Sequence, residues 1–149
     1  MASIIYMTDF AEAYARGLLL GIARYAESVG EAWNICRLPL SIRDRFGIKA
    51  VVEYAYTHHA DAVIGQFNPQ DDVSLFTKQG ILVLAQDFKS PFTDIPNIRG
   101  EYRKSGEMAA DYFINKGFRN FGFYGVKHVN WSEDRRKGFL DVISSKVPG

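Results

Sequence analysis

Short apolar segments alternate with longer segments of helical periodicity along the whole of this sequence. The apolar segments are residues 3–7, 32–37, 61–66 and 81–85, followed by a short one at Ile98. Chains of this kind form parallel sheets, because each helix carries the chain back to the start of the next strand in a right-handed βαβ unit. The alternation therefore predicts an α/β fold with a doubly wound parallel sheet.

The most informative stretch runs from Ile98 to Leu140. Spacings of three and four residues in its first half predict a helix that ends at Gly117. The expected apolar face of this helix consists of Met108, Ala109, Tyr112 and Phe113. Residues 120–125 are too few for a helix and rich in aromatics, so they predict a buried strand. Ser132 then suits the N-cap of a last helix.

Three further helices are expected between the earlier strands. The first ends at Gly30. Its apolar face is expected to consist of Tyr14, Leu18, Ile22, Tyr25 and Val29. Pro39 and the charged residues 43–45 predict a solvated loop before a second helix, which is marked from Ile48 onward. The paired aspartates at 71–72 suit the start of a short third helix.

The composition is that of a globular protein with no bias toward nucleic acid. Of the 149 residues, 47% are hydrophobic and 23% are charged, which supports one ordinary core and excludes a disordered chain. The formal net charge of +1 gives no electrostatic case for DNA binding by this chain. Cys36 is alone, so an internal disulfide is excluded. The N-terminus has no basic leader and no apolar run has the length of a membrane span, so we expect a cytoplasmic protein.

The pieces of the stretch after Ile98 also follow the order of a known family. They are residues 98–101, residues 112–117, Arg119, the apolar segment 121–125, and residues 135–139 with the sequence Arg-Arg-Lys-Gly-Phe. In this order the chain resembles the sensor domains of the lac repressor and periplasmic sugar-binding family, and most of all those of bacterial xylose operon regulators. One departure is Glu101, which stands where the family has aspartate and whose extra methylene would shift the carboxylate.

The resemblance implies a sensor of two similar α/β lobes with a ligand cleft between them. In this architecture, the type I periplasmic-binding-protein fold, residues 1–118 would form the first lobe with strand order 2-1-3-4-5. Residues 119–149 would supply the first strand and helix of a second lobe, which would be truncated. We therefore expect the chain to be a fragment of a longer protein.

Candidate ligand-binding residues gather where the expected strands end. In an open parallel sheet, ligands bind outside the carboxyl ends of the strands, because loops and helix N-termini converge there. Carboxylates and arginine bridge sugar hydroxyls, and flat rings cover the apolar face of a sugar. The candidates are Asp9, Phe10, Tyr14, Asp87, Phe88, Glu101, Trp131 and Arg135. Arg135 is the strongest, because the resemblance implies that the arginine at this position reaches into the cleft.

Several of these candidates also have a plainer structural interpretation. Asp9 and Glu101 could cap the helices that follow them, and Asp87 could form a turn. Tyr14 could belong to the core, and Trp131 could plug the junction of the two lobes.

Enzyme and cofactor chemistry find no support in the sequence. It has no glycine-rich phosphate loop of either common pattern. His58 and His59 are adjacent and lack a further ligand at suitable spacing, so no metal site is expected. Cys36 lies in the middle of an expected strand, where a small buried thiol is its ordinary role. Gly138, in the last helix, indicates close packing and not chemistry. We expect no cofactor and no catalytic activity.

These observations and the resemblance lead to one expectation and two alternatives. We expect the effector-binding domain of a bacterial transcription regulator, which binds a sugar, in particular a pentose such as xylose. It would act as a homodimer without membrane contact, and the sugar would control DNA binding by a module outside this chain. The first alternative is a transport-type sugar-binding protein of the same fold. The second is an enzyme built on a flavodoxin-like sheet.

Overall fold

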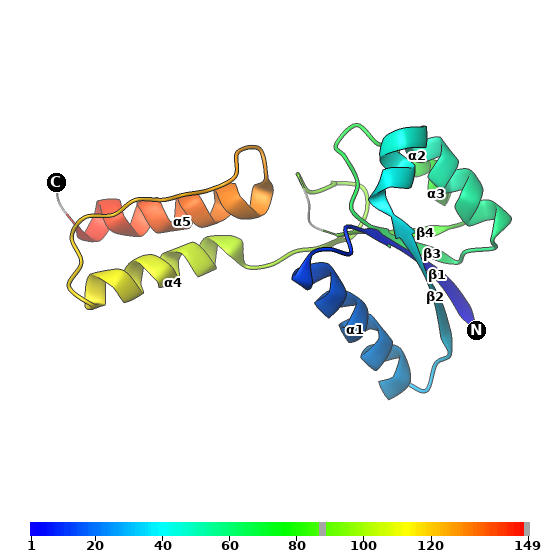
Figure 1. Ribbon diagram of the computed structural model, residues 1–149, viewed down its shortest axis with the longest axis horizontal. Coiled ribbons are helices and arrows are strands. Elements are labelled where there is room, and N and C mark those ends of the chain that lie inside the picture. Colours follow the sequence, from blue (N-terminus) through cyan, green and yellow to red (C-terminus); the bar gives the residue numbers. More distant parts are fainter. Residues whose placement is uncertain (87–88, 148–149) are drawn as a thin grey trace. The chain divides into compact units, whose positions relative to one another are not determined.

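The computed structural model describes residues 1–86 and 89–147, which divide into two compact units (Figure 1). Unit 1 consists of residues 1–86 and 92–98. Unit 2 consists of residues 99–147 together with 89–91. The two hydrophobic core clusters of the described residues both lie in unit 1, and each unit is described by itself.

Unit 1 contains a sheet of five parallel strands in the order β2-β1-β3-β4-β5. The strands are β1 (Ala2–Thr8), β2 (Trp33–Pro39), β3 (Ala62–Gly65), β4 (Leu82–Gln86) and β5 (Asn97–Ile98). The predicted parallel sheet and its strand order are both confirmed. Because β1 lies between β2 and β3, the chain changes direction beside it, which is where ligands bind in sheets of this kind.

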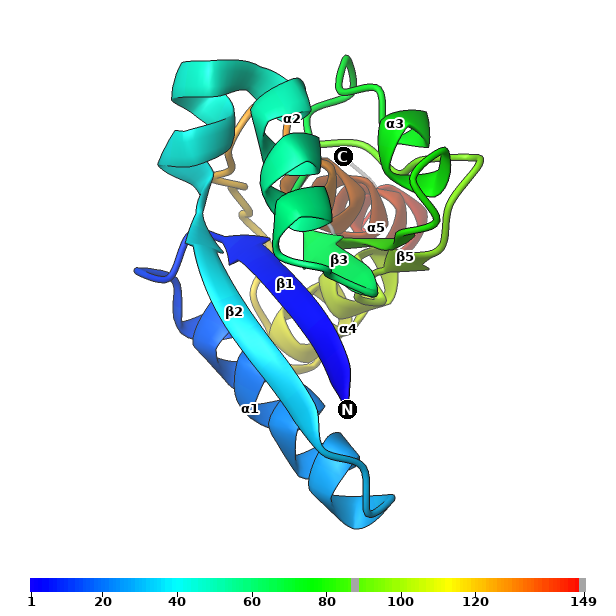
Figure 2. The ribbon, with the colours of Figure 1, turned by 90° about the vertical axis from the view of Figure 1, so that its right-hand side faces the viewer.

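Helices cover both faces of this sheet, as Figure 2 shows. One face carries α1 (Ala13–Ser28), and the other carries α2 (Leu40–Thr57) and α3 (Ser74–Thr77). The core under α2 and α3 includes Val51, Phe67 and Phe76, which are at most 1% exposed. The core under α1 is smaller and centres on Ile4, Tyr6 and Ile64.

α1 packs on the sheet through a narrower face than the sequence predicts. Its buried residues are Ala15 and Ala26, flanked by the partly buried Leu18, Leu19 and Ile22. Tyr14, Tyr25 and Val29, which were expected on this face, are all exposed. The two alanines allow the helix to approach the strands closely, and the larger rings lie at the margin of the contact.

The solvated loop expected at residues 43–45 is wrong, because these residues form the first turns of α2. Gly47, with φ 78° and ψ 172°, interrupts the helix and separates these turns from the rest. A positive φ of this size is readily adopted only by glycine. Arg43 in the first turns is only 4% exposed, so its charge lies inside unit 1.

Unit 2 consists of two helices, α4 (Tyr102–Asn115) and α5 (Asn130–Lys146), which run in the same direction (Figure 1). Their backbones touch at two glycines. A Cβ atom at Gly106 would lie 2.1 Å from the carbonyl oxygen of Arg135, and one at Gly138 would lie 2.1 Å from that of Arg103. The prediction that Gly138 serves close helix packing is confirmed.

This crossing also decides which face of α4 is buried. The helix buries Gly106 and Ala110. The aromatic face that the sequence predicts is exposed, with Met108 at 65%, Tyr112 at 60% and Phe113 at 41%. Small residues are required here, because larger side chains would hold the two backbones apart.

The strand expected at residues 120–125 does not form in the described part of the chain. The segment is extended and returns along α5 (Figure 1). The rings of Phe121 and Phe123 lie 6.2 and 5.9 Å from that of Phe139, whereas Tyr124 is 100% exposed. A strand needs a hydrogen-bonded neighbour, and the described part of unit 2 offers none.

The start of α5 also differs from the prediction. The helix begins at Asn130, with Val129 as its N-cap, so Ser132 lies within the first turn. Ser132 is 3% exposed, and its Oγ accepts a hydrogen bond of 2.8 Å from the backbone N–H of Val126. The serine thus fixes the loop that enters the helix.

Candidate functional site

Two buried glutamines lie side by side at the carboxyl edge of the sheet in unit 1. Gln66 follows β3 and Gln86 ends β4, next to the paired residues Gly65 and Ala85. Both side chains are at most 3% exposed. Oε1 of Gln66 and Nε2 of Gln86 have no hydrogen-bond partner among the described residues. The acceptor of Gln66 and the donor of Gln86 are therefore left open, each at a cost of about 1–3 kcal/mol.

Tyr6 orients the amide of Gln86. Its Oη lies 3.0 Å from Gln86 Oε1 and 3.0 Å from the carbonyl oxygen of Ala15, so its proton is shared between two acceptors. Burial raises the pKa of Tyr6 to about 12, which keeps the hydroxyl protonated near neutral pH. The bond to Oε1 leaves Nε2 of Gln86 as the free end of the amide.

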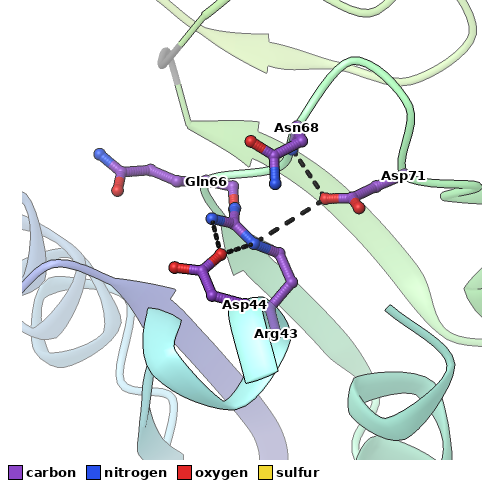
Figure 3. A network of polar contacts seen from close by, with 5 residues as sticks. All are labelled: Arg43, Asp44, Gln66, Asn68 and Asp71. Carbon is purple, nitrogen blue, oxygen red and sulfur yellow. Dashed lines mark hydrogen bonds and ion pairs between the residues drawn. The ribbon is translucent and has the colours of Figure 1, made fainter. Parts of the chain in front are cut away.

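A buried guanidinium fixes the loop that follows β3 (Figure 3). Nε and Nη2 of Arg43 donate to Asp44 Oδ1 at 3.0 and 2.7 Å, and Nη1 donates to the carbonyl oxygen of Gln66. Asp71 Oδ2 lies 4.0 Å from Arg43 Nε and accepts a 2.7 Å hydrogen bond from the N–H of Asn68. Figure 3 shows the amide of Gln66 pointing away from this network. The charge of Arg43 is thus balanced within unit 1.

A hollow of about 480 Å³ opens where β1 and β2 end. Residues 8–11, 39–41 and 44 line it, so it includes the predicted site residues Asp9 and Phe10. Arg16 Nη1 donates to the carbonyl oxygens of Phe10 and Ala11 at 3.0 and 2.6 Å. Asp9 Oδ1 accepts a 2.9 Å hydrogen bond from the N–H of Ala11. Asp9 therefore stabilises this loop and does not cap α1.

Tyr14, another predicted site residue of unit 1, does not line this hollow. Tyr14, in the first turn of α1, is 48% exposed, so its interpretation as a core residue is wrong. Asp87 and Phe88 lie outside the described residues. Their roles stay predictions.

In unit 2, the side chain of Arg135 contacts two aromatic rings. Its guanidinium carbon is 4.9 Å from the ring centre of Tyr102, the first residue of α4, and 5.3 Å from that of Trp131, one turn earlier on α5. Both contacts are within the range of cation–π attraction. Within the described residues Arg135 makes no ion pair. Its N–H groups remain available to a ligand.

Glu101 lies immediately before α4 and is exposed. Its carbonyl oxygen accepts 3.0 Å hydrogen bonds from the N–H and the Oγ of Ser105. Its carboxylate makes no capping hydrogen bond, so the capping interpretation is not supported. Within unit 2 the structure therefore brings Trp131 and Arg135 together, and it adds Tyr102 to them.

Two further properties of the described residues bear on function. Residues 1–86 and 89–147 contain no group of three or more His, Cys, Asp or Glu side chains arranged to hold a metal ion. In the same ranges, no helix combines the length and the apolar character needed to cross a bilayer.

Four residues of these sites were not among the candidates predicted from the sequence. Gln66 and Gln86 share a signal that could have revealed them, since each is a neutral amide placed directly at the end of an apolar strand. Tyr102 carries only the weak signal of an aromatic beside Glu101. Nothing in the sequence reveals Arg43, because it belongs to the charged run 43–45, and such a run is typical of a solvated loop.

The chain matches no protein-family model and no curated protein. Its fold is shared by solved structures. One is a periplasmic binding protein/LacI transcriptional regulator from Alkaliphilus metalliredigens QYMF complexed with D-xylulofuranose, with a TM-score of 0.73 at 22% identity. Another is a periplasmic solute-binding protein of an ABC transporter from Actinobacillus succinogenes 130z with bound D-allose, with a TM-score of 0.78 at 15% identity. A third is the transcription regulator CcpA of Lactococcus lactis, with a TM-score of 0.73 at 12% identity.

These similarities cover 98%, 99% and 100% of this chain, but only 53%, 56% and 56% of the three solved chains. The chain thus spans about half the length of the structures that it matches. At such identities the comparison establishes the fold alone. The chain has the α/β fold of type I periplasmic binding proteins, which transport proteins and LacI-type regulators share.

Proposed function

We propose that this chain belongs to the effector-binding domain of a bacterial transcription regulator, and that its effector is a pentose such as xylose. The observation that carries the proposal is Arg135, whose guanidinium contacts two aromatic rings and has hydrogen-bond donors available. Rigid donors beside flat apolar rings suit a sugar, which presents hydroxyls at its edge and C–H groups on its faces. The D-xylulofuranose in one structure of the same fold supports the choice of a pentose.

The carboxyl edge of unit 1 supports a neutral ligand. Gln66 offers an acceptor and Gln86 offers a donor, and a hydroxyl group can satisfy both because it donates and accepts. Arg43, the buried cation of this edge, is already balanced by Asp44 and Asp71. We therefore infer that a free sugar is bound in preference to a sugar phosphate.

The proposal includes a domain arrangement and a mechanism. Residues 1–118 would form a first lobe, and residues 119–149 would open a second lobe that longer relatives complete. The half-length coverage of the matched structures supports this. The sugar would favour one of two conformations of a homodimer and so change its affinity for DNA, which a module outside this chain would bind. Such a regulator acts in the cytoplasm.

Titration calorimetry with a panel of sugars tests the proposal. The panel contains D-xylose, L-arabinose, D-ribose, D-glucose and D-ribose 5-phosphate. We expect binding of a pentose, and a loss of at least about tenfold in affinity for Arg135→Ala, because a hydrogen bond to a charged group contributes about 1.5–3 kcal/mol. Arg136→Ala is the matched control, since Arg136 is exposed and next in sequence. Equal losses in the two variants, or no binding by the wild type, would contradict the proposal.

A transport-type sugar-binding protein is the second candidate. The solute-binding protein with bound D-allose, at a TM-score of 0.78, favours it. Sugar-dependent binding of operator DNA by the full-length protein would support the regulator. Sugar binding without any DNA binding would support the transport protein, and turnover of a sugar phosphate would support the enzyme alternative.

A further inference from the structure

The ring of Tyr102 contacts the guanidinium group of Arg135. Its ring lies 4.9 Å from the guanidinium carbon, and the Trp131 ring lies 5.3 Å from it. All three residues are partly buried. An arginine side chain free in solvent samples many rotamers, and binding a ligand would require it to lose this freedom. Contact with the two rings removes part of this freedom before any ligand arrives.

The Tyr102 ring is itself held in place by the backbone before α4. A Cβ atom built on Gly100 would lie 2.6 Å from Cε1 and 2.8 Å from Cζ of the tyrosine ring. The ring therefore packs directly on the glycine, and any side chain at position 100 would displace it. Gly100 thus contacts Tyr102, and Arg135 contacts both Tyr102 and Trp131.

The backbone of Arg135 is fixed as well. Its carbonyl oxygen contacts Gly106, which lies one turn after Tyr102 on the same helix. Tyr102 and Gly106 thus act on the same arginine, one on the side chain and one on the main chain. Neither residue needs to touch a ligand in order to do so.

We propose that Tyr102 is a positioning residue, which holds the Arg135 guanidinium in the orientation that binds the effector. This inference rests on the proposed sugar site at Arg135. It assigns to Tyr102 a role that depends on its aromatic ring and not on its hydroxyl group. Tyr102→Phe should therefore retain the role, and Tyr102→Leu should lose it.

Two measurements test this inference. The first is the NMR resonance of the Arg135 Nε–H group, which adjacent rings displace and which an Arg135→Lys variant identifies by its disappearance. We expect the displaced resonance in the wild type and in Tyr102→Phe, and a value typical of solvent-exposed arginine in Tyr102→Leu. This measurement needs no ligand, so it decides the positioning role even if no sugar of the panel binds.

The second measurement is calorimetry with D-xylose. We expect Tyr102→Leu to weaken binding by about 3- to 30-fold, the range of a partly desolvated cation–π contact, and Tyr102→Phe to stay within about twofold. Tyr112→Leu on the same helix is the control, because Tyr112 is 60% exposed and should not affect binding. Gly100→Ala, which displaces the ring without removing it, should give an intermediate loss and guards against a Leu variant that fails to fold.

The outcomes separate the inference from the function on which it rests. An Arg135 resonance that is the same in Tyr102→Leu as in the wild type overturns the positioning role, as does unchanged affinity in that variant. Wild-type protein that binds no sugar overturns the proposed function, whereas a resonance that moves only in Tyr102→Leu and Gly100→Ala still supports the positioning role.

Discussion

Gln66 combines deep burial with an acceptor atom that has no partner among the described residues. An amide in this situation destabilises the fold unless a ligand completes its bonds. We expect Gln66→Met, which has a similar shape, to raise the free energy of unfolding by about 1 kcal/mol and to weaken pentose binding. Urea unfolding and calorimetry provide the two measurements. Gln79→Met is the control, because Gln79 is exposed and should change stability by less than about 0.5 kcal/mol. A clear loss of stability in Gln66→Met would mean that the amide is already satisfied.

Because Tyr6 is buried, we expect the stability of the fold to decrease as the pH rises in the alkaline range. Its pKa is about 12 in the folded protein against 10.0 for a free tyrosine, because burial disfavours the anion. Between these values the unfolded chain has released the proton and the folded chain retains it. The stabilisation is therefore complete below about pH 10 and lost as the pH rises toward 12, up to about 3 kcal/mol.

The check is urea unfolding of wild type, Tyr6→Phe and Tyr56→Phe at about pH 9 and about pH 12. Tyr6→Phe should lose less stability over this interval than the wild type, because it has no proton to release. Tyr56 is 61% exposed, so Tyr56→Phe should follow the wild type. Identical slopes for all three proteins would show that Tyr6 ionises as freely in the fold as in the unfolded chain.

Two elements of unit 1 are joined by Arg43, which connects the start of α2 with the loop after β3. Removing it would leave Asp71, whose side chain is 11% exposed, without its cation. We expect Arg43→Met to lower the free energy of unfolding by about 3–5 kcal/mol, the range for removing one partner of a buried ion pair. Arg45→Met, two residues further and exposed, should change it by less than about 0.5 kcal/mol. Comparable effects of the two substitutions in urea unfolding would contradict the burial of Arg43.

In the helices, the same Gly→Ala substitution is expected to raise the stability at some positions and to lower it at others. Gly17 and Gly21 in α1 have no atom within 4 Å of an added Cβ, so Gly→Ala there should raise stability by about 0.4–1 kcal/mol. At Gly106 and Gly138 the added Cβ would lie 2.1 Å from a carbonyl oxygen, so Gly→Ala there should lower it by about 1–3 kcal/mol or more. Native-state hydrogen exchange, which reports on each unit separately, provides the measurement. Stabilisation at position 106 or 138 would mean that α4 and α5 do not touch.

Helices and strands could be predicted from the sequence where the pattern that marks them lies within the element itself. The strands of unit 1 and the positions of α1, α4 and α5 follow from periodicity and glycine stops, and the parallel sheet follows from their alternation. The buried face of α4 could not be predicted, because a close crossing favours Gly106 and Ala110 over the larger residues that hydrophobicity favours. The strand at 120–125 failed for a related reason, since a strand depends on a neighbour distant in the sequence.

The candidate site was predictable only in part, because much of it also depends on contacts between residues distant in the sequence. Topology alone placed Asp9 and Phe10 at the ends of strands, and the family resemblance singled out Arg135. The contact of Tyr102 with Arg135 and the open amides of Gln66 and Gln86 depend on how side chains from different elements meet. Such contacts leave no periodic pattern in the sequence.

At the scale of the whole molecule, the segment 119–125 differs from every strand of unit 1. Its backbone N–H groups donate to no acceptor among the described residues, whereas those of β1, β3 and β4 take part in a parallel ladder. We expect these amides to exchange with solvent at nearly the unprotected rate in the 149-residue chain, while Ile5, Val63 and Leu84 exchange slowly.

The same amides should become protected in a longer protein that supplies the strands of a second lobe, because each added strand provides backbone acceptors. Hydrogen exchange followed by mass spectrometry on both proteins makes the comparison, and the peptides of β1 serve as an internal control. Slow exchange at 119–125 in the 149-residue chain would show that the segment is already paired, for example with a second copy. In that case Tyr124→Lys, which places a charge on the exposed side, should restore fast exchange and leave β1 unchanged.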